Sequence, residues 1–362
     1  MRRLFVIAAL AAAVGTMANA QERVVNVYNW SDYIDPQVLE QFSKETGIKV
    51  RYDTFDANET LETKLLAGKS GYDVVVPTGY FLQRQIQATV FQRLDKSKLP
   101  NLVNVWPEVA KRLAVYDPGN QYAVNYMWGT TGIGYNVKAM HERLGANATI
   151  DSWDVVFKPE LLAKFKTCGI HMLDSADDII PAALHYLGLD PNSAKQADLD
   201  KAAALMAKIR PNVRKFHSSE YLNALASGEI CLVVGWSGDI KQSQKRAAEA
   251  KNGVDIGYAI PKEGAQMFFD NLAIPRDAPH PAEALAFIDF LLRPDVAAKN
   301  SDMVAYANGN LASQKLIDKT VLDDPGIYPS ADTMSRLYIV EARSPEAQRL
   351  INRMWTRVKT GR

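Results

Sequence analysis

Short apolar runs alternate, along the first part of the chain, with segments whose apolar positions recur every three to four residues. Residues 24–28 predict a short strand, the alternation of Ile48, Val50 and Tyr52 predicts the next, and residues 72–76 predict a buried strand. Between them, Asp35-Pro36 opens a predicted helix that Gly47 ends, and Asn58 is expected to cap another. The order strand, helix, strand, helix, strand predicts a mostly parallel sheet with helices on its faces.

A second unit of the same kind follows. Residues 122–136 are rich in aromatic and β-branched residues and predict a strand, and Gly132-Ile133-Gly134 within it lacks the third glycine of a dinucleotide fingerprint. The remaining predictions are a strand at 229–235 and helices at 194–209, 222–226, 282–292 and from Ser344-Pro345 onward. Two α/β units without a flexible linker predict two lobes joined by crossing strands.

The first twenty residues have a different pattern. Arg2 and Arg3 precede an uninterrupted apolar run over residues 4–14, and Ala18-Asn19-Ala20 is a small-x-small sequence. This pattern predicts a secretory signal peptide cleaved after Ala20. Because the residue directly after Ala20 is not Cys, no lipid anchor is expected. We expect a soluble, exported protein.

The composition narrows the class of protein. Lys and Arg total 42 against 41 Asp and Glu, a net charge of +1 that becomes about −1 once the signal peptide is removed. A near-neutral balance argues against a nucleic-acid binder. Two cysteines are too few for a disulfide scaffold or an iron–sulfur cluster. In an oxidising compartment Cys168 and Cys231 favour a single disulfide, with two separate buried thiols as the alternative.

Motifs of catalysis are absent from the sequence. None of the five histidines falls at HExxH or HxxxH spacing, so no metal site is predicted. There is no GxSxG, SxxK or P-loop motif, and we expect no catalytic residues and no cofactor. A triad assembled in space from distant residues stays open.

Five short clusters combine aromatic, acidic and small polar residues near predicted strand ends. In open α/β sheets, ligands bind beyond the carboxyl ends of strands. Carboxylates neutralise ammonium groups, and aromatic rings contact methylenes and attract cations. Each cluster alone is more often core or turn, but together they predict a site for a cationic, partly apolar ligand. The clusters are residues 29–33, 77–81, 173–178, 235–239 and 267–271.

The chain resembles the periplasmic polyamine-binding proteins of ABC importers, most closely the putrescine-binding branch. The resemblance covers residues 21–362 and is carried by Tyr28-Asn29-Trp30-Ser31-Asp32-Tyr33, Tyr72-Asp73-Val74-Val75-Val76-Pro77, Trp128-Gly129-Thr130-Thr131-Gly132, Gly235-Trp236-Ser237-Gly238-Asp239 and Phe290-Leu291-Leu292-Arg293-Pro294. It implies an α/β, two-lobed periplasmic solute-binding protein of type II. Each lobe has a mixed sheet flanked by helices, with residues 21–129 and 261–303 in lobe 1 and 130–260 and 304–362 in lobe 2.

The resemblance also implies a ligand set. Asp270 and Asp239 are expected to hold one ammonium group, with Asp178 and Asp32 near the other. Compared with close relatives, Thr78 retains a hydroxyl, Tyr80 replaces a small Ser, and Asp178 replaces Glu. Cys168 and Cys231 fall where putrescine-binding relatives carry a disulfide. The full set of implied ligand residues is Trp30, Ser31, Asp32, Tyr33, Thr78, Tyr80, Asp178, Trp236, Asp239, Phe268, Asp270 and Tyr306.

The resemblance finally implies function. The mature protein is expected to be a periplasmic monomer that binds putrescine and delivers it to an inner-membrane ABC permease. Phe268, where spermidine-binding relatives tend to have Trp, favours a diamine. Spermidine, agmatine or cadaverine are alternatives of the same class. A basic amino acid needs an Arg that the clusters lack, an iron-binding protein needs clustered Tyr and His ligands, and a periplasmic hydrolase is the alternative from another class.

Overall fold

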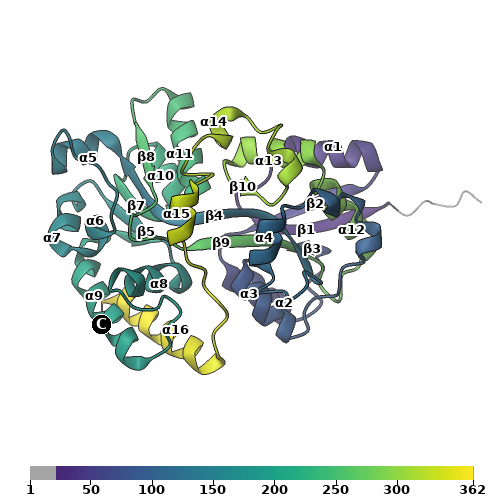
Figure 1. The fold of residues 1–362 in the computed structure, drawn as a ribbon, viewed down its shortest axis with the longest axis horizontal. Coiled ribbons are helices and arrows are strands. Elements are labelled where there is room, and N and C mark those ends of the chain that lie inside the picture. The colour runs from purple at the N-terminus through teal and green to yellow at the C-terminus, as the bar shows by residue number, and fades with distance from the viewer. Residues whose placement is uncertain (1–21, 362) are drawn as a thin grey trace, which may run out of the picture.

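The computed structural model describes residues 22–361, so the expected signal peptide, residues 1–20 with cleavage after Ala20, lies outside the described residues. Two lobes lie side by side, and long strands run from one lobe into the other (Figure 1). Within residues 22–361, no helix is long and apolar enough to span a membrane.

The first lobe begins with the strand and helix order that the sequence predicts. Asp35 caps α1 by accepting a hydrogen bond from the Gln37 backbone N–H, and Gly47 ends the helix at φ 68°, a conformation that favours glycine. The elements up to the first crossing are β1 (Val24–Trp30), α1 (Pro36–Thr46), β2 (Lys49–Phe55), α2 (Asn58–Leu66), β3 (Val74–Val75), α3 (Gly79–Gln87) and α4 (Pro107–Leu113).

The prediction that Asn58 caps α2 is wrong. Ala57 occupies the cap position, and Asn58 is the buried first residue of the helix. Its amide instead donates to Thr78 Oγ1 at 3.0 Å, and its carbonyl accepts from the Thr78 backbone N–H at 3.2 Å. The side chain therefore fixes the loop after β3.

A long strand, β4 (Ala123–Asn136), runs from the first lobe into the second. Its first half pairs antiparallel with β9 (Met267–Ala273), and its second half pairs antiparallel with β7 (Leu232–Trp236). The strand order is β2-β1-β3-β9-β4-β7-β5-β6, with β8 and β10 also paired to β4. The pairs β1–β2, β1–β3, β5–β6 and β5–β7 are parallel, so the sheet is mixed.

The second lobe surrounds the other half of β4, and the chain then returns to the first lobe. The last helix of the chain, α16, begins after Ser344, as the sequence predicts, and the Ser344 hydroxyl caps it. The elements after the crossing are α5 (Val137–Leu144), α6 (Asp154–Phe157), α7 (Pro159–Leu162), β5 (Ile170–Met172), α8 (Ala176–Tyr186), α9 (Gln196–Ile209), β6 (Lys215–Phe216), α10 (Tyr221–Ala226), α11 (Ser237–Ala250), β8 (Ile256–Ala259), α12 (Pro281–Leu291), α13 (Pro294–Val304), β10 (Ala307–Asn308), α14 (Lys319–Leu322), α15 (Ala331–Arg336) and α16 (Pro345–Thr360).

Two hydrophobic cores divide the chain differently from the expected lobe boundary at residues 303/304. The first core includes Tyr306, Ile317 and Val340, which were expected in lobe 2. The reason is that β10 pairs with the first-lobe half of β4, opposite Met127 and Trp128, and so holds this segment in lobe 1. The final helix alone returns to the second core, through Ile351, Met354, Trp355 and Val358.

The predicted disulfide is confirmed. Cys168 and Cys231 are bonded, with their Cα atoms 5.6 Å apart. They lie just before β5 and β7, two neighbouring parallel strands of the second lobe. The bond therefore joins segments that are 63 residues apart in sequence but adjacent in the sheet.

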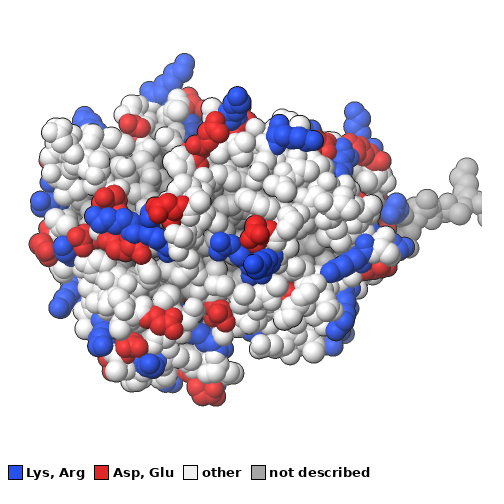
Figure 2. Space-filling view, viewed as in Figure 1, with Lys and Arg blue, Asp and Glu red and all other residues white. Residues whose placement is uncertain are grey.

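Basic and acidic side chains alternate over the face drawn in Figure 2, without a large area of one sign. This distribution agrees with the near-zero net charge of the sequence. Recognition of a charged ligand then depends on how the charged side chains are arranged around a binding site, and the cavity between the lobes has such an arrangement.

Candidate binding site between the lobes

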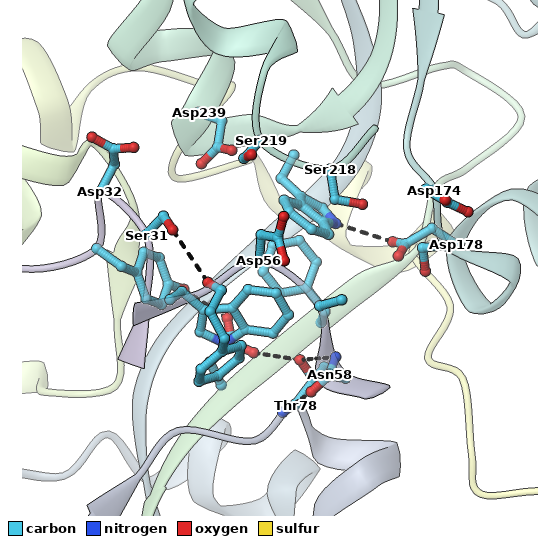
Figure 3. A pocket seen from close by; sticks show the side chains of 18 of the residues that line it. Ser31, Asp32, Asp56, Asn58, Thr78, Asp174, Asp178, Ser218, Ser219 and Asp239 are labelled. Carbon is cyan, nitrogen blue, oxygen red and sulfur yellow. Dashed lines mark hydrogen bonds between the residues drawn. The ribbon is translucent and has the colours of Figure 1, made fainter. Parts of the chain in front are cut away.

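A cavity lies between the lobes at the ends of their strands, and all twelve residues that the sequence implicated line it. Figure 3 shows acidic side chains around a central group of aromatic rings. The side of the first core contributes Trp30, Tyr33, Tyr80, Phe268 and Tyr306 of that core and the polar residues Ser31, Asp32, Thr78 and Asp270 beside them. The second lobe contributes Asp178, Trp236 and Asp239.

Sequence reasoning missed several other lining residues. Asp56 follows β2 and Ser218 follows β6, so the rule that ligands bind beyond strand ends would have found both. Asp174 belonged to a recognised cluster but pairs with Lys359 instead of being free. The further lining residues are Phe55, Ala57, Asn58, Glu59, Ser175, Ser219, Leu222 and Gln266.

Asp270 is one of two almost fully buried acids that line the cavity. Its Oδ2 accepts a hydrogen bond from the Tyr33 hydroxyl at 2.8 Å, and its Oδ1 accepts one from Thr78 Oγ1 at 2.6 Å. Burial raises the pKa of Asp270 to about 7, and the charges of Asp178 and Asp239 act in the same direction. Among residues 22–361 no cationic side chain pairs with this carboxylate, so a cationic ligand stabilises its charged form.

Asp239, in the first turn of α11, is held in the same manner. Its two oxygens accept hydrogen bonds from the hydroxyls of Tyr306 at 2.7 Å and Tyr221 at 2.8 Å. Burial raises the pKa of Asp239 to about 6. Tyr306 reaches it because Gly238 carries no side chain, since a Cβ there would collide with the Tyr306 ring.

Asp178 lies at the opposite end of the cavity from Asp239 (Figure 3). Its Oδ1 accepts hydrogen bonds from Thr131 Oγ1 at 2.6 Å and from the Trp236 indole N–H at 3.2 Å. Burial is the main cause that raises the pKa of Asp178. Tyr80 is also buried. Its burial, and after it the charges of Asp178 and Asp177, raise the pKa of its hydroxyl.

Aromatic rings from both lobes line the space between these acids. Trp30 and Trp236 meet edge to face with their centroids 5.5 Å apart. Phe268 lies next in the row, 6.4 Å from Trp236 and 6.3 Å from Tyr306. The Trp30 indole N–H donates to the Val76 carbonyl, which fixes its ring against the cavity. Such walls suit the methylenes of a flexible chain.

Asp32 lies elsewhere than expected. It is on the side of Asp239 and not beside Asp178 (Figure 3), and its carboxylate pairs with Arg246 of α11 at 2.7 Å. Gln242 of the same helix donates to the Asp32 carbonyl at 3.2 Å. The backbone of Asp32 adopts φ 55°, which is uncommon for a non-glycine residue. Asp32 therefore links the two lobes at the rim of the cavity, and its carboxylate is already neutralised.

A metal centre is not indicated in the part of the chain that the structure describes, because no three of its His, Cys, Asp or Glu residues are grouped to hold an ion. The acids of the cavity are separated by aromatic rings and are bonded to hydroxyl donors. This arrangement suits an elongated organic cation better than a single small ion.

Two α/β lobes with a cavity at their junction define a bilobal solute-binding protein. Comparison with known proteins agrees: residues 37–329 match the family of bacterial extracellular solute-binding proteins, and the chain belongs to that family. As a member it is a transport component and not an enzyme.

Individual relatives are similar over nearly the whole chain. The putrescine-binding periplasmic protein SpuD of Pseudomonas aeruginosa is 53% identical, over 98% of this chain and 96% of its own. The putrescine-binding periplasmic protein PotF of Escherichia coli is 51% identical over the same shares. The solved structure of the spermidine/putrescine ABC transporter substrate-binding protein PotD of Streptococcus pneumoniae superposes with a TM-score of 0.77 at 29% identity, covering 94% of this chain and 99% of that one.

Proposed function

We propose that the mature chain, residues 21–362, binds putrescine in the cavity between its lobes and delivers it in the periplasm to an inner-membrane ABC permease. The observation that carries this proposal is the set of three buried carboxylates, Asp178, Asp239 and Asp270, set around an aromatic channel. Two relatives of more than 50% identity that bear the name putrescine-binding support it.

In this proposal one ammonium group lies at Asp239 and Asp270 and the other at Asp178. Burying an ammonium group costs several kcal/mol unless it is paired. Each end of the cavity therefore needs at least one carboxylate. Trp30, Trp236, Phe268 and Tyr306 contact the four methylenes between the charges, and Ser31, Tyr33, Thr78 and Tyr80 complete the walls. Asp32 acts by linking the lobes rather than by holding an ammonium group.

The lobes in this proposal are residues 22–129 with 267–340, and residues 131–265 with 345–361. A ligand that contacts both lobes stabilises the closed form and shifts the population toward it. The permease then recognises the closed form, and a monomer is sufficient for this task. Export by the signal peptide, with cleavage after Ala20, places the protein in the periplasm.

A thermal-shift panel of amines tests the function. Putrescine, cadaverine, agmatine, spermidine, lysine and a monoamine are compared at one concentration, because a ligand that binds only the folded state raises its melting temperature. We expect putrescine to give the largest shift. A panel in which no diamine moves the melting temperature would remove the proposed function.

The affinity for putrescine is expected to fall by more than about tenfold between pH 8 and pH 5.5. Putrescine keeps both charges over this range, while Asp270 and Asp239, with pKa values raised to about 7 and about 6, become protonated as the pH falls. Binding at pH 5.5 must then release protons from these groups. Calorimetry at both pH values, in buffers of different ionisation enthalpy, measures both effects, and a pH-independent affinity would contradict this account.

A further inference from the structure

Gln266 lines the cavity, and nothing in the sequence pointed to it. It immediately precedes β9, and it is only 1% exposed. Its side-chain oxygen, Oε1, is buried and accepts no hydrogen bond from the described residues. A buried amide carbonyl without a donor is destabilising, so a donor supplied by a ligand would be favourable there.

Backbone contacts place Gln266 at the Asp178 end of the cavity. The Thr131 backbone N–H donates to the Gln266 carbonyl at 3.0 Å, while the Thr131 hydroxyl donates to Asp178 Oδ1 at 2.6 Å. Both residues therefore contact Thr131. Because Asp178 Oδ1 also accepts the Trp236 indole N–H, that oxygen is already occupied by two donors.

We propose that Gln266 is a specificity-determining residue, whose amide oxygen accepts an N–H from the ligand head group that pairs with Asp178. The inference rests on the proposed function and assigns a role to one residue of that site. A primary ammonium group has three N–H donors, and Asp178 Oδ1 already accepts hydrogen bonds from Thr131 and Trp236. Gln266 lines the cavity, and the last torsion of an amide side chain is broad, so a small rotation suffices in this proposal to bring Oε1 to the ligand.

The consequence is selection for a nitrogen head group at this end of the ligand. A site with a buried polar group discriminates strongly against an analogue that cannot pair with that group. A monoamine such as 1-aminobutane places a methyl group at Asp178 and Gln266 and leaves both unpaired. Gln266 therefore helps the site to distinguish a diamine from a monoamine of the same chain length.

Replacing Gln266 by Leu tests this role by calorimetry with putrescine at pH 8. The Gln266→Leu variant is expected to bind putrescine at least tenfold more weakly, while its melting temperature without ligand stays the same or rises. Gln266→Glu keeps an acceptor oxygen and is expected to bind at least as tightly as the unchanged protein. Gln85 provides a matched control, since it is fully buried, neither of its side-chain polar atoms has a partner, and it does not line the cavity.

The Gln85→Leu variant is expected to keep the unchanged affinity. If Gln266→Leu binds putrescine within twofold of the unchanged protein, or if Gln85→Leu weakens binding equally, the role of Gln266 is refuted. Both results presuppose that the unchanged protein binds putrescine in the same experiment. Absence of that binding would instead refute the proposed function, so the two failures are distinguishable.

Discussion

Replacing Asp270 by Asn is expected to weaken putrescine binding by about 100-fold or more, because the variant leaves an ammonium group buried without its counter-charge. The Tyr33 and Thr78 hydroxyls that now donate to the carboxylate would face a neutral amide with one acceptor oxygen. Calorimetry at pH 8, where the native carboxylate is charged, measures the loss most clearly.

The Asp270→Asn variant is not expected to unfold more easily without ligand. The raised pKa of Asp270, caused mainly by burial, means that its charged form is unfavourable in the protein without a cationic ligand. Its melting temperature without ligand should therefore match or exceed that of the unchanged protein. Asp332→Asn, at an exposed acid on α15, is the matched control and should not change affinity. Near-unchanged putrescine affinity in Asp270→Asn would remove Asp270 from the site.

Removing the disulfide is expected to have the largest effect on stability. A bond that closes a loop of 63 residues restricts the unfolded chain, and loop-closure entropy gives a stabilisation of about 4 kcal/mol. The double variant Cys168→Ala with Cys231→Ala should lose about 2–4 kcal/mol of unfolding free energy in denaturant. Its putrescine affinity should be within twofold, because neither cysteine lines the cavity.

Reductant supplies the control for this prediction. Dithiothreitol should lower the denaturation midpoint of the unchanged protein toward that of the double variant and should leave the variant itself unaffected. Equal midpoints for the oxidised protein and the variant would show that the bond contributes nothing to stability.

The sequence predicted helix boundaries correctly where interactions between residues close in sequence determine them. Asp35 and Gly47 bound α1 as expected, since a cap and a left-handed C-terminal residue act within a few residues of the helix. Asn58 has equally good capping chemistry but bonds to Thr78 instead. That choice depends on a loop 20 residues away in sequence, which a local pattern does not contain.

The sequence predicted which residues line the candidate site, but not their hydrogen-bond partners or their positions in the cavity. Strand ends meet at one edge of a sheet, so clusters that follow strands converge, as Asp178 after β5 and Asp239 after β7 do. Asp270 was expected near a strand end but lies within β9. Which hydroxyls hold each acid follows from tertiary contacts, and Tyr221 and Thr131 were not anticipated. Asp32 was assigned to the wrong end, because its partner Arg246 is 214 residues away.

The core to which the residues after 303 belong depends on tertiary pairing in the same way. The segment around Tyr306 has the composition of either core, and only the pairing of β10 with β4 decides that it belongs to the first. Gln266 shows the same limit inside the cavity. A single glutamine before a strand is unremarkable in sequence, and its significance comes from burial and a carbonyl without a donor.

Calorimetry of the mature chain, residues 21–362, with putrescine and with spermidine tests the central claim most directly. The account predicts one putrescine site per chain and an affinity at least tenfold higher for putrescine than for spermidine at pH 8. Absence of putrescine binding would contradict the proposal that the three buried carboxylates form a diamine site. Equal or tighter binding of spermidine would contradict the proposed preference for a diamine.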